Sequence, residues 1–274
     1  FNDRNVRYAF SYLYDREELN REIYFNEYGM MNSLYSGSVY ENKNNSVFKY
    51  NPEKAIRLLK EAGYSKRNSD GWLVHDVTGN VLSFEIIIPK TNAYMVTPFQ
   101  QKLKEYGVDM QIKLMNFSTM IKNVNARNFN ICLLAYSGLL FPNPEASLLS
   151  KLADQNGSNN IWGFKSRRVD ELLNEYDICF DQERRIEILQ EIDGIFCDVH
   201  PIAFSFARNY SRVMWWDKFD YPDWMLSRHA GEFWDVFYYW WYSDEKNKVL
   251  IQSINSDKSL PKKQMDMEYW AKFN

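Results

Sequence analysis

The segment from residue 81 to residue 136 alternates between extended and helical patterns, and this alternation constrains the fold most strongly. Residues 81–88 are rich in β-branched and aromatic side chains, and residues 108–115 alternate apolar and polar side chains. Residues 130–136 form a third, short apolar run, and the two intervening segments space their apolar residues as helices do. This order of strand, helix, strand, helix and strand predicts an α/β layer in which helices cover a sheet.

Three capped helices are predicted before this segment. Asp3 and Asp15 stand where their side-chain oxygens can cap the first two helices. Asn51 caps the third, and Pro52 occupies its first position, where the missing N–H costs nothing.

A helical hairpin is predicted after the sheet. Residues 169–176 and 186–196 each carry an apolar stripe, and Asp181 is the expected cap of the second helix. Residues 201–206 and 213–216 are predicted as strands. The chain then passes through an aromatic cluster, and a loosely packed polar tail is expected beyond Ser243.

Composition excludes several classes of protein. With 45% apolar residues, 25% charged residues and a net charge of −3, the chain is expected to be soluble and globular. It has no basic excess, so nucleic acid is not an expected partner. No run approaches the roughly 18 residues of a membrane span, and the N-terminus lacks a signal-peptide pattern.

Cysteine and histidine spacing gives no support for a metal or cofactor. Cys132 lies in an apolar run, whereas Cys179 and Cys197 end successive helical patterns and are predicted to lie too far apart for a disulfide. Neither these cysteines nor the three histidines match a zinc-binding spacing. We therefore expect no metal and no cofactor. We also expect no enzymatic activity, because no set of nucleophile, base and orienting residue can be assembled from this sequence.

Aromatic residues make up 17% of the chain, which is unusually high. Most of them are expected in the core, because aromatic rings bury large areas. A surplus of tryptophan and tyrosine would also suit a cavity that holds flexible ligands.

Several motifs, in a fixed order, resemble one family. They are the helix from Pro52-Glu53-Lys54-Ala55 to Ala62-Gly63-Tyr64, the turn Asp70-Gly71-Trp72, the helix Val169-Asp170-Glu171-Leu172-Leu173 and the segments 212–219 and 240–244. With the opening helices, they resemble the second half of the extracellular solute-binding proteins of family 5, the dipeptide and oligopeptide binders of ABC importers. Segments 212–219 and 240–244 resemble the branch that takes up longer peptides and microcin C. The resemblance covers residues 1 to about 246.

The resemblance implies a fold like that of type II periplasmic binding proteins, with two α/β lobes joined by a hinge. Residues 1–200 would form the second lobe, a mixed sheet flanked by helices. Residues 201–246 would return to complete the first lobe, and residues 247–274 would be a polar tail. The rest of the first lobe and the signal peptide are expected upstream of Phe1, so the chain is expected to be a fragment.

The implied function is capture of an oligopeptide, or a peptide-like conjugate, in the cleft between the lobes. The implied partners are this ligand and the membrane permease of an ABC transporter, and the implied location is the periplasm. We expect a monomer, in which closure around the ligand shifts an equilibrium between open and closed forms.

The family also suggests which residues line the cleft. The loop after the third strand supplies Tyr136, Ser137 and Gly138, and an asparagine-rich loop supplies Asn159, Asn160 and Trp162. Several peptide binders hold the peptide amino group with an acidic residue in the first loop. Here no acid occurs before Glu145, so this anchor departs from the pattern. Each of these side chains could alternatively be a turn residue or part of the core.

Two other functions are consistent with parts of the sequence. A glycoside hydrolase would need two carboxylates facing each other across a cleft, whereas Glu183 and Glu187 lie four residues apart on one predicted helix. A structural or partner-binding protein with an exposed aromatic surface is the second alternative.

Overall fold

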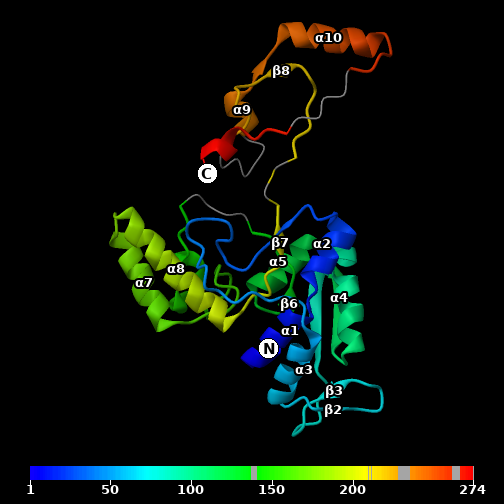
Figure 1. The fold of residues 1–274 in the computed structure, drawn as a ribbon, viewed down its shortest axis with the longest axis vertical. Coiled ribbons are helices and arrows are strands. Elements are labelled where there is room, and N and C mark those ends of the chain that lie inside the picture. The colour runs from blue at the N-terminus through cyan, green and yellow to red at the C-terminus, as the bar shows by residue number, and fades with distance from the viewer. Residues whose placement is uncertain (137–140, 209, 211, 228–234, 261–265, 274) are drawn as a thin grey trace. The chain divides into compact units, whose positions relative to one another are not determined.

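The computed structural model describes all residues except 137–140, 209, 211, 228–234, 261–265 and 274. Contacts divide the chain into two compact units (Figure 1). Unit 1 comprises residues 1–136 and 142–209, and unit 2 comprises residues 137–141 and 210–274.

Unit 1 has mixed α/β structure. Its helices are α1 (Arg4–Leu13), α2 (Arg16–Tyr24), α3 (Pro52–Glu61), α4 (Ala93–Glu105), α5 (Phe117–Asn125), α6 (Glu145–Leu148), α7 (Arg167–Ile178) and α8 (Gln182–Val199), with 3₁₀ turns η1 (Lys90–Asn92) and η2 (Ser150–Leu152). Its strands are β1 (Gly29–Met30), β2 (Lys66–Arg67), β3 (Leu73–Val74), β4 (Ser83–Pro89), β5 (Asp109–Met115), β6 (Ile131–Cys132) and β7 (Phe206–Ala207).

The three predicted helix caps are confirmed. Asp3 accepts a hydrogen bond from the backbone N–H of Asn5 at the start of α1. Asp15 caps α2, and Asn51 caps α3, which has Pro52 at its first position. Each carboxylate or amide oxygen satisfies one of the N–H groups that a helix leaves unpaired at its N-terminus.

The central sheet has the strand order β5-β4-β6, and both pairings are parallel. Successive side chains of β4 point to opposite faces. Ile86 and Ile88 pack in the core that contains residues of α1, α3 and α4. Ile87 packs with residues of α5 and β6. Helices therefore cover both faces of the sheet, and the predicted α/β layer is confirmed.

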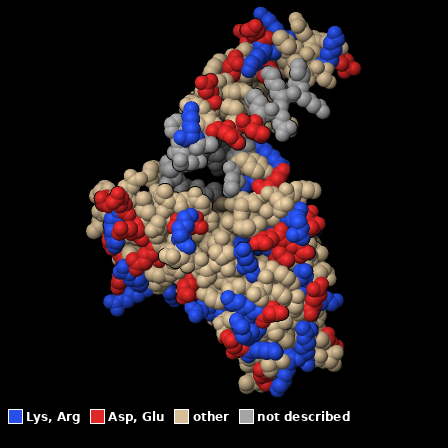
Figure 2. Space-filling model, in the orientation of Figure 1, with Lys and Arg blue, Asp and Glu red and all other residues tan. Residues whose placement is uncertain are grey.

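Helices α7 and α8 form the predicted hairpin. Asp181 caps α8 by accepting a hydrogen bond from the N–H of Arg184 at 2.8 Å. The two helices share a separate core that includes Leu172 and Ile192, both fully buried. Their outer surface carries ion pairs such as Arg168 with Glu191, and Figure 2 shows acidic and basic side chains intermixed over the molecular face that it draws.

Two predicted strands of unit 1 are much shorter in the structure. The third apolar run, 130–136, is paired with β4 only at Ile131 and Cys132. The segment 201–206 becomes a strand only at Phe206, where β7 pairs antiparallel with β1.

Unit 2 contains β8 (Phe219–Asp220), α9 (Asp235–Tyr239), β9 (Trp241–Tyr242), α10 (Asp244–Asn255) and η3 (Tyr269–Phe273). Strands β8 and β9 pair antiparallel. The predicted strand 213–216 is wrong, because the paired segment begins at Phe219. Helix α10 starts within the polar segment for which no regular structure was expected. Within the described parts of the chain, no helix combines the length and the apolar character needed to cross a membrane.

Candidate functional site

Exposed aromatic side chains follow each of the three parallel strands. Tyr94 lies in the first turn of α4 after β4, Phe117 begins α5 after β5, and Tyr136 follows β6. Their exposed fractions are 56%, 61% and 64%. Because parallel strands end at the same edge of a sheet, all three belong to its carboxyl edge.

The carboxyl edge is also where the strand order reverses. The chain passes from β4 to β5 on one side and then crosses to β6 on the other side of β4. Open α/β sheets bind their ligands outside the carboxyl ends of the strands at such a switch point. The carboxyl edge of β5-β4-β6 is therefore the candidate functional site.

Two of the residues predicted for the site lie together. The ring of Tyr136 is 5.9 Å from the ring of Trp162, measured between centroids, and the two planes are tilted by 38°. Trp162 is half-buried and makes an edge contact with Phe196 of α8 at 5.4 Å. Trp162 thus has one side in the core of the α7–α8 hairpin and another toward Tyr136.

Asn160 is a core residue, whereas Asn159 is exposed. The side chain of Asn160 is fully buried and donates to the carbonyl oxygens of Leu149 and Phe164 at 3.2 and 2.9 Å. Its own oxygen accepts from the N–H of Phe164 at 2.9 Å. These bonds occupy the amide, so the geometry assigns Asn160 a structural part in the loop.

Ser137 and Gly138 lie outside the described residues. Their predicted place in the ligand site stays a prediction.

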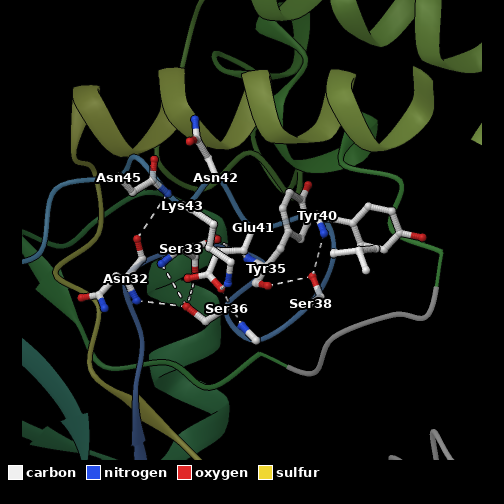
Figure 3. A network of polar contacts seen from close by, with 12 residues as sticks. Asn32, Ser33, Tyr35, Ser36, Ser38, Tyr40, Glu41, Asn42, Lys43 and Asn45 are labelled. Carbon is white, nitrogen blue, oxygen red and sulfur yellow. Dashed lines mark hydrogen bonds and ion pairs between the residues drawn. The ribbon is translucent and has the colours of Figure 1, made fainter. Parts of the chain in front are cut away.

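The long segment between β1 and α3 is held by a buried carboxylate of α8. Asp193 is fully buried and accepts hydrogen bonds from Ser33 Oγ at 2.7 Å and from the N–H of Leu34 at 3.0 Å. It also accepts from the N–H of Asn42 at 3.0 Å and from Asn45 Nδ2 at 2.7 Å. Figure 3 shows the polar contacts within this segment. Loops of this length are usually functional or disordered, and here Asp193 fixes one.

The buried side chain of Arg16 also binds the segment between β1 and α3. The guanidinium of Arg16 donates to the carbonyl oxygens of Met31 and Phe48 and to Asn32 Oδ1. It also donates to the carbonyl oxygen of Phe204, next to β7. Burial lowers the pKa of Arg16 from its ordinary value. No local sequence pattern indicates this role of Arg16, because its acceptors lie 15 or more residues further along the chain.

A small cavity of about 10 Å³ lies beside Arg16 and is partly lined by Ser11 and His200. Such a volume holds about one water molecule and no larger ligand. His200 Nε2 lies 2.6 Å from Ser11 Oγ, and burial lowers the pKa of His200 to about 4. This imidazole is therefore neutral at ordinary pH.

Cys132, Glu183 and Glu187 are among the groups considered from the sequence for metal binding or catalysis, and His229, also considered, lies outside the described residues. Burial raises the pKa of Cys132 to about 12, which keeps this thiol protonated. Glu187 is exposed and pairs with Arg184 at 2.9 Å on the outer face of α8, and Glu183 is exposed on the same helix. Among the described residues, no three His, Cys, Asp or Glu side chains lie close enough together to hold a metal ion.

Comparisons with known proteins identify the family. The family model of bacterial extracellular solute-binding proteins, family 5, middle region, matches residues 1–159. The chain is 24% identical over 257 residues to the protein YejA of Escherichia coli, covering 81% of this chain and 42% of YejA. It is 23% identical over 223 residues to the oligopeptide-binding protein AppA of Bacillus subtilis, covering 78% of this chain and 40% of AppA.

The fold agrees with this match. The solved structure of AppA from Bacillus subtilis in complex with a nonapeptide superposes with a TM-score of 0.72 at 20% identity, covering 89% of this chain and 48% of that one. The chain thus spans less than half the length of these relatives. It belongs to the family of bacterial extracellular solute-binding proteins, family 5, and it has the fold of the type II periplasmic binding proteins.

Proposed function

We propose that this chain is part of the substrate-binding component of an ABC importer, which captures oligopeptides or peptide-like conjugates. The observation that carries this proposal is the match of residues 1–159 to the family model of extracellular solute-binding proteins. AppA of Bacillus subtilis is named an oligopeptide-binding protein, and its solved structure holds a nonapeptide. The family membership also supports a binding function without catalysis.

In this proposal unit 1 corresponds to the second lobe, predicted as residues 1–200, and residues 201–246 help to complete the first lobe. Residues 201–209 belong to unit 1, where β7 pairs with β1. The exposed apolar residues of unit 2 support the proposal that residues 201–246 help to complete the first lobe. Among its described hydrophobic residues only Met225 and Leu250 are buried, while Met214, Phe237 and Tyr238 are 98%, 71% and 78% exposed. Such a surface needs a covering partner. The remainder of the first lobe would supply it.

The ligand would lie against the carboxyl edge of β5-β4-β6. Tyr136 and Trp162 would contact it, together with Ser137, Gly138 and Asn159 of the neighbouring loops. Tyr94 and Phe117 extend this set along the edge. Aromatic surfaces without fixed charge hold many different side chains by van der Waals contact, which suits a binder that tolerates varied sequences.

Closure of the two lobes would enclose the ligand, and the membrane permease would recognise the closed form. A ligand drives such a closure only by the difference in its affinity for the two forms. The periplasm is the proposed location, and the binding component is proposed to act as a monomer.

The exposed aromatic surface of unit 2 also favours a second function, namely binding to another protein. In that case the surface of Phe237 and Tyr238 would contact a partner instead of the rest of the first lobe.

Native mass spectrometry of the full-length protein that carries this chain tests the proposal. Co-purifying peptides, and thermal stabilisation by peptides of varied sequence, are expected. Absence of stabilisation by any peptide of a library, together with a co-purifying protein partner, would overturn the proposal in favour of the second function.

A further inference from the structure

Arg127 lies directly after α5 in a backbone conformation that favours glycine. Its φ is +52°, in the left-handed region, and its N–H donates to the carbonyl oxygen of Val124 at 2.9 Å. Helices often end in this conformation, and glycine adopts it with the least strain. The interactions of the Arg127 side chain therefore have to offset the strain of this backbone conformation.

The guanidinium of Arg127 supplies such interactions to the segment 152–160. Nη2 donates to the carbonyl oxygen of Leu152 at 3.0 Å, to Ser158 Oγ at 2.8 Å and to the carbonyl oxygen of Asn160 at 3.0 Å. Nε donates to the same oxygen of Asn160 at 3.3 Å. All these acceptors are neutral, and all belong to one segment. Arg127 therefore ties the end of α5 to that segment.

The segment continues into a closed turn that carries Trp162. Asn160 bonds to both the N–H and the carbonyl oxygen of Phe164, so the ends of the turn are fixed. Ser158 Oγ also donates to the carbonyl oxygen of Leu152 at 2.7 Å. Residues 152–164 thus form a hydrogen-bonded frame that carries Trp162 and that Arg127 anchors, while the Trp162 ring also packs against Phe196 of α8.

Tyr136 depends on the same frame. The pairing of β6 with β4 ends at Cys132, four residues before Tyr136. The ring of Tyr136 lies against the ring of Trp162, with 5.9 Å between the two centroids. Displacing Trp162 would therefore remove this ring contact of Tyr136.

We propose that Arg127 is a positioning residue, which holds the Trp162–Tyr136 ring pair at the carboxyl edge of the sheet. The ring pair takes a planar apolar group of the ligand, such as an aromatic side chain. This inference rests on the proposed function. Arg127 acts through the frame and does not contact the ligand.

The test uses the full-length protein with Arg127→Ala and Arg127→Lys variants. The probes are a penta-alanine peptide and its analogues with one phenylalanine at each position in turn, measured by calorimetry at a temperature where circular dichroism shows all variants folded. The preference of the wild type for its best phenylalanine analogue is expected to fall about fivefold in R127A, since aromatic contacts contribute on this scale. R127K is expected to retain part of the preference, because lysine can still donate to one acceptor.

Arg185→Ala is the matched control. Arg185 also donates to backbone carbonyl oxygens, those of Tyr176 and Cys179 at 3.0 and 2.9 Å, but at the turn of the α7–α8 hairpin. R185A is expected to keep the preference for the phenylalanine analogue. An equal loss of affinity for all peptides in R127A, or a loss as large in R185A, would overturn the positioning role.

Hydrogen exchange separates this inference from the proposed function. Amides of residues 152–164 are expected to exchange faster in R127A, while those of β4 and β5 keep their protection. Unchanged exchange in 152–164 overturns the inference whether or not peptides bind. If the wild type binds none of the peptides, the proposed function fails, and faster exchange in R127A would still support the frame.

Discussion

Ser33 Oγ donates a 2.7 Å hydrogen bond to the buried carboxylate of Asp193, which lies 160 residues further along the chain. Leu34 donates its N–H to the other oxygen of the same carboxylate. The segment after β1 is therefore fixed to α8 by a charged acceptor that water does not reach. Removing that acceptor leaves several buried donors without partners.

Asp193→Asn is expected to lower the free energy of unfolding by roughly 2–3 kcal/mol, since an amide nitrogen then faces buried donors. Urea unfolding monitored by circular dichroism measures the change. Asp177→Asn is the control, because Asp177 is exposed on α7 of the same hairpin, and it is expected to leave stability unchanged. Equal midpoints for the two variants would contradict the clamping role of Asp193.

Stability is expected to fall in acid because of His200. Burial lowers the pKa of His200 to about 4, with the charges of Arg7 and Arg16 contributing. The unfolded chain, in which the pKa of histidine is about 6.5, binds more protons than the folded chain between these values. The contribution of His200 is therefore complete above pH 6.5 and is lost as the pH falls toward 4, by at most about 3 kcal/mol.

Unfolding measured from pH 7 to pH 4 in the wild type and in His200→Asn checks this expectation. Asparagine tolerates the left-handed backbone conformation of residue 200, where φ is +59°. Because asparagine does not bind a proton in this pH range, the variant should lose stability less steeply than the wild type. An identical slope in both proteins would show that other groups cause the acid dependence.

Asn160→Ala is expected to destabilise the protein by about 2–3 kcal/mol, because it leaves the N–H and carbonyl groups of Phe164 without their buried partner. Asn159→Ala, at the exposed neighbouring position, is the control and should change stability by less than about 0.5 kcal/mol. Thermal unfolding of both variants makes the comparison. A stable N160A protein with reduced peptide affinity would instead return Asn160 to the ligand site.

Alanine at Tyr94, Phe117 or Tyr136 is expected to weaken peptide binding with little effect on folding, since all three rings are exposed. Loss of one aromatic contact corresponds to a three- to tenfold weaker affinity, about 0.5–1.5 kcal/mol. Phe180→Ala is the control, because this ring is 96% exposed in the turn between α7 and α8. Calorimetry with a peptide that binds the wild type measures all four variants. Unchanged affinity in the first three would remove the carboxyl edge from the site.

Local features of the fold could be predicted from the sequence, because their causes lie within a few residues. The caps Asp3, Asp15 and Asn51 are each bonded to an N–H two or three residues later. The alternation within residues 81–136 is similarly local. Strand lengths were less predictable, since they depend on pairing with residues far along the chain: β6 pairs with β4 only at Ile131 and Cys132.

The candidate site was only partly predictable. Tyr136 and Trp162 were named through the family resemblance, and the structure brings their rings together. Tyr94 and Phe117 were missed because, in a chain so rich in aromatic residues, single rings resemble core residues. Their position just after the predicted strands 81–88 and 108–115 was the available signal. Long-range partners such as Arg16 and Phe204 left no local pattern at all.

The early end of β6 has a consequence for protein engineering. The ladder with β4 stops at Cys132, and beyond it Leu133 and Leu134 are held by core packing on the two faces of the sheet. Substitutions within residues 131–134 would therefore disturb this packing together with the position of Tyr136. Specificity should instead be redesigned, or transplanted from another family member, by exchanging residues 158–164 as one cassette together with residue 127.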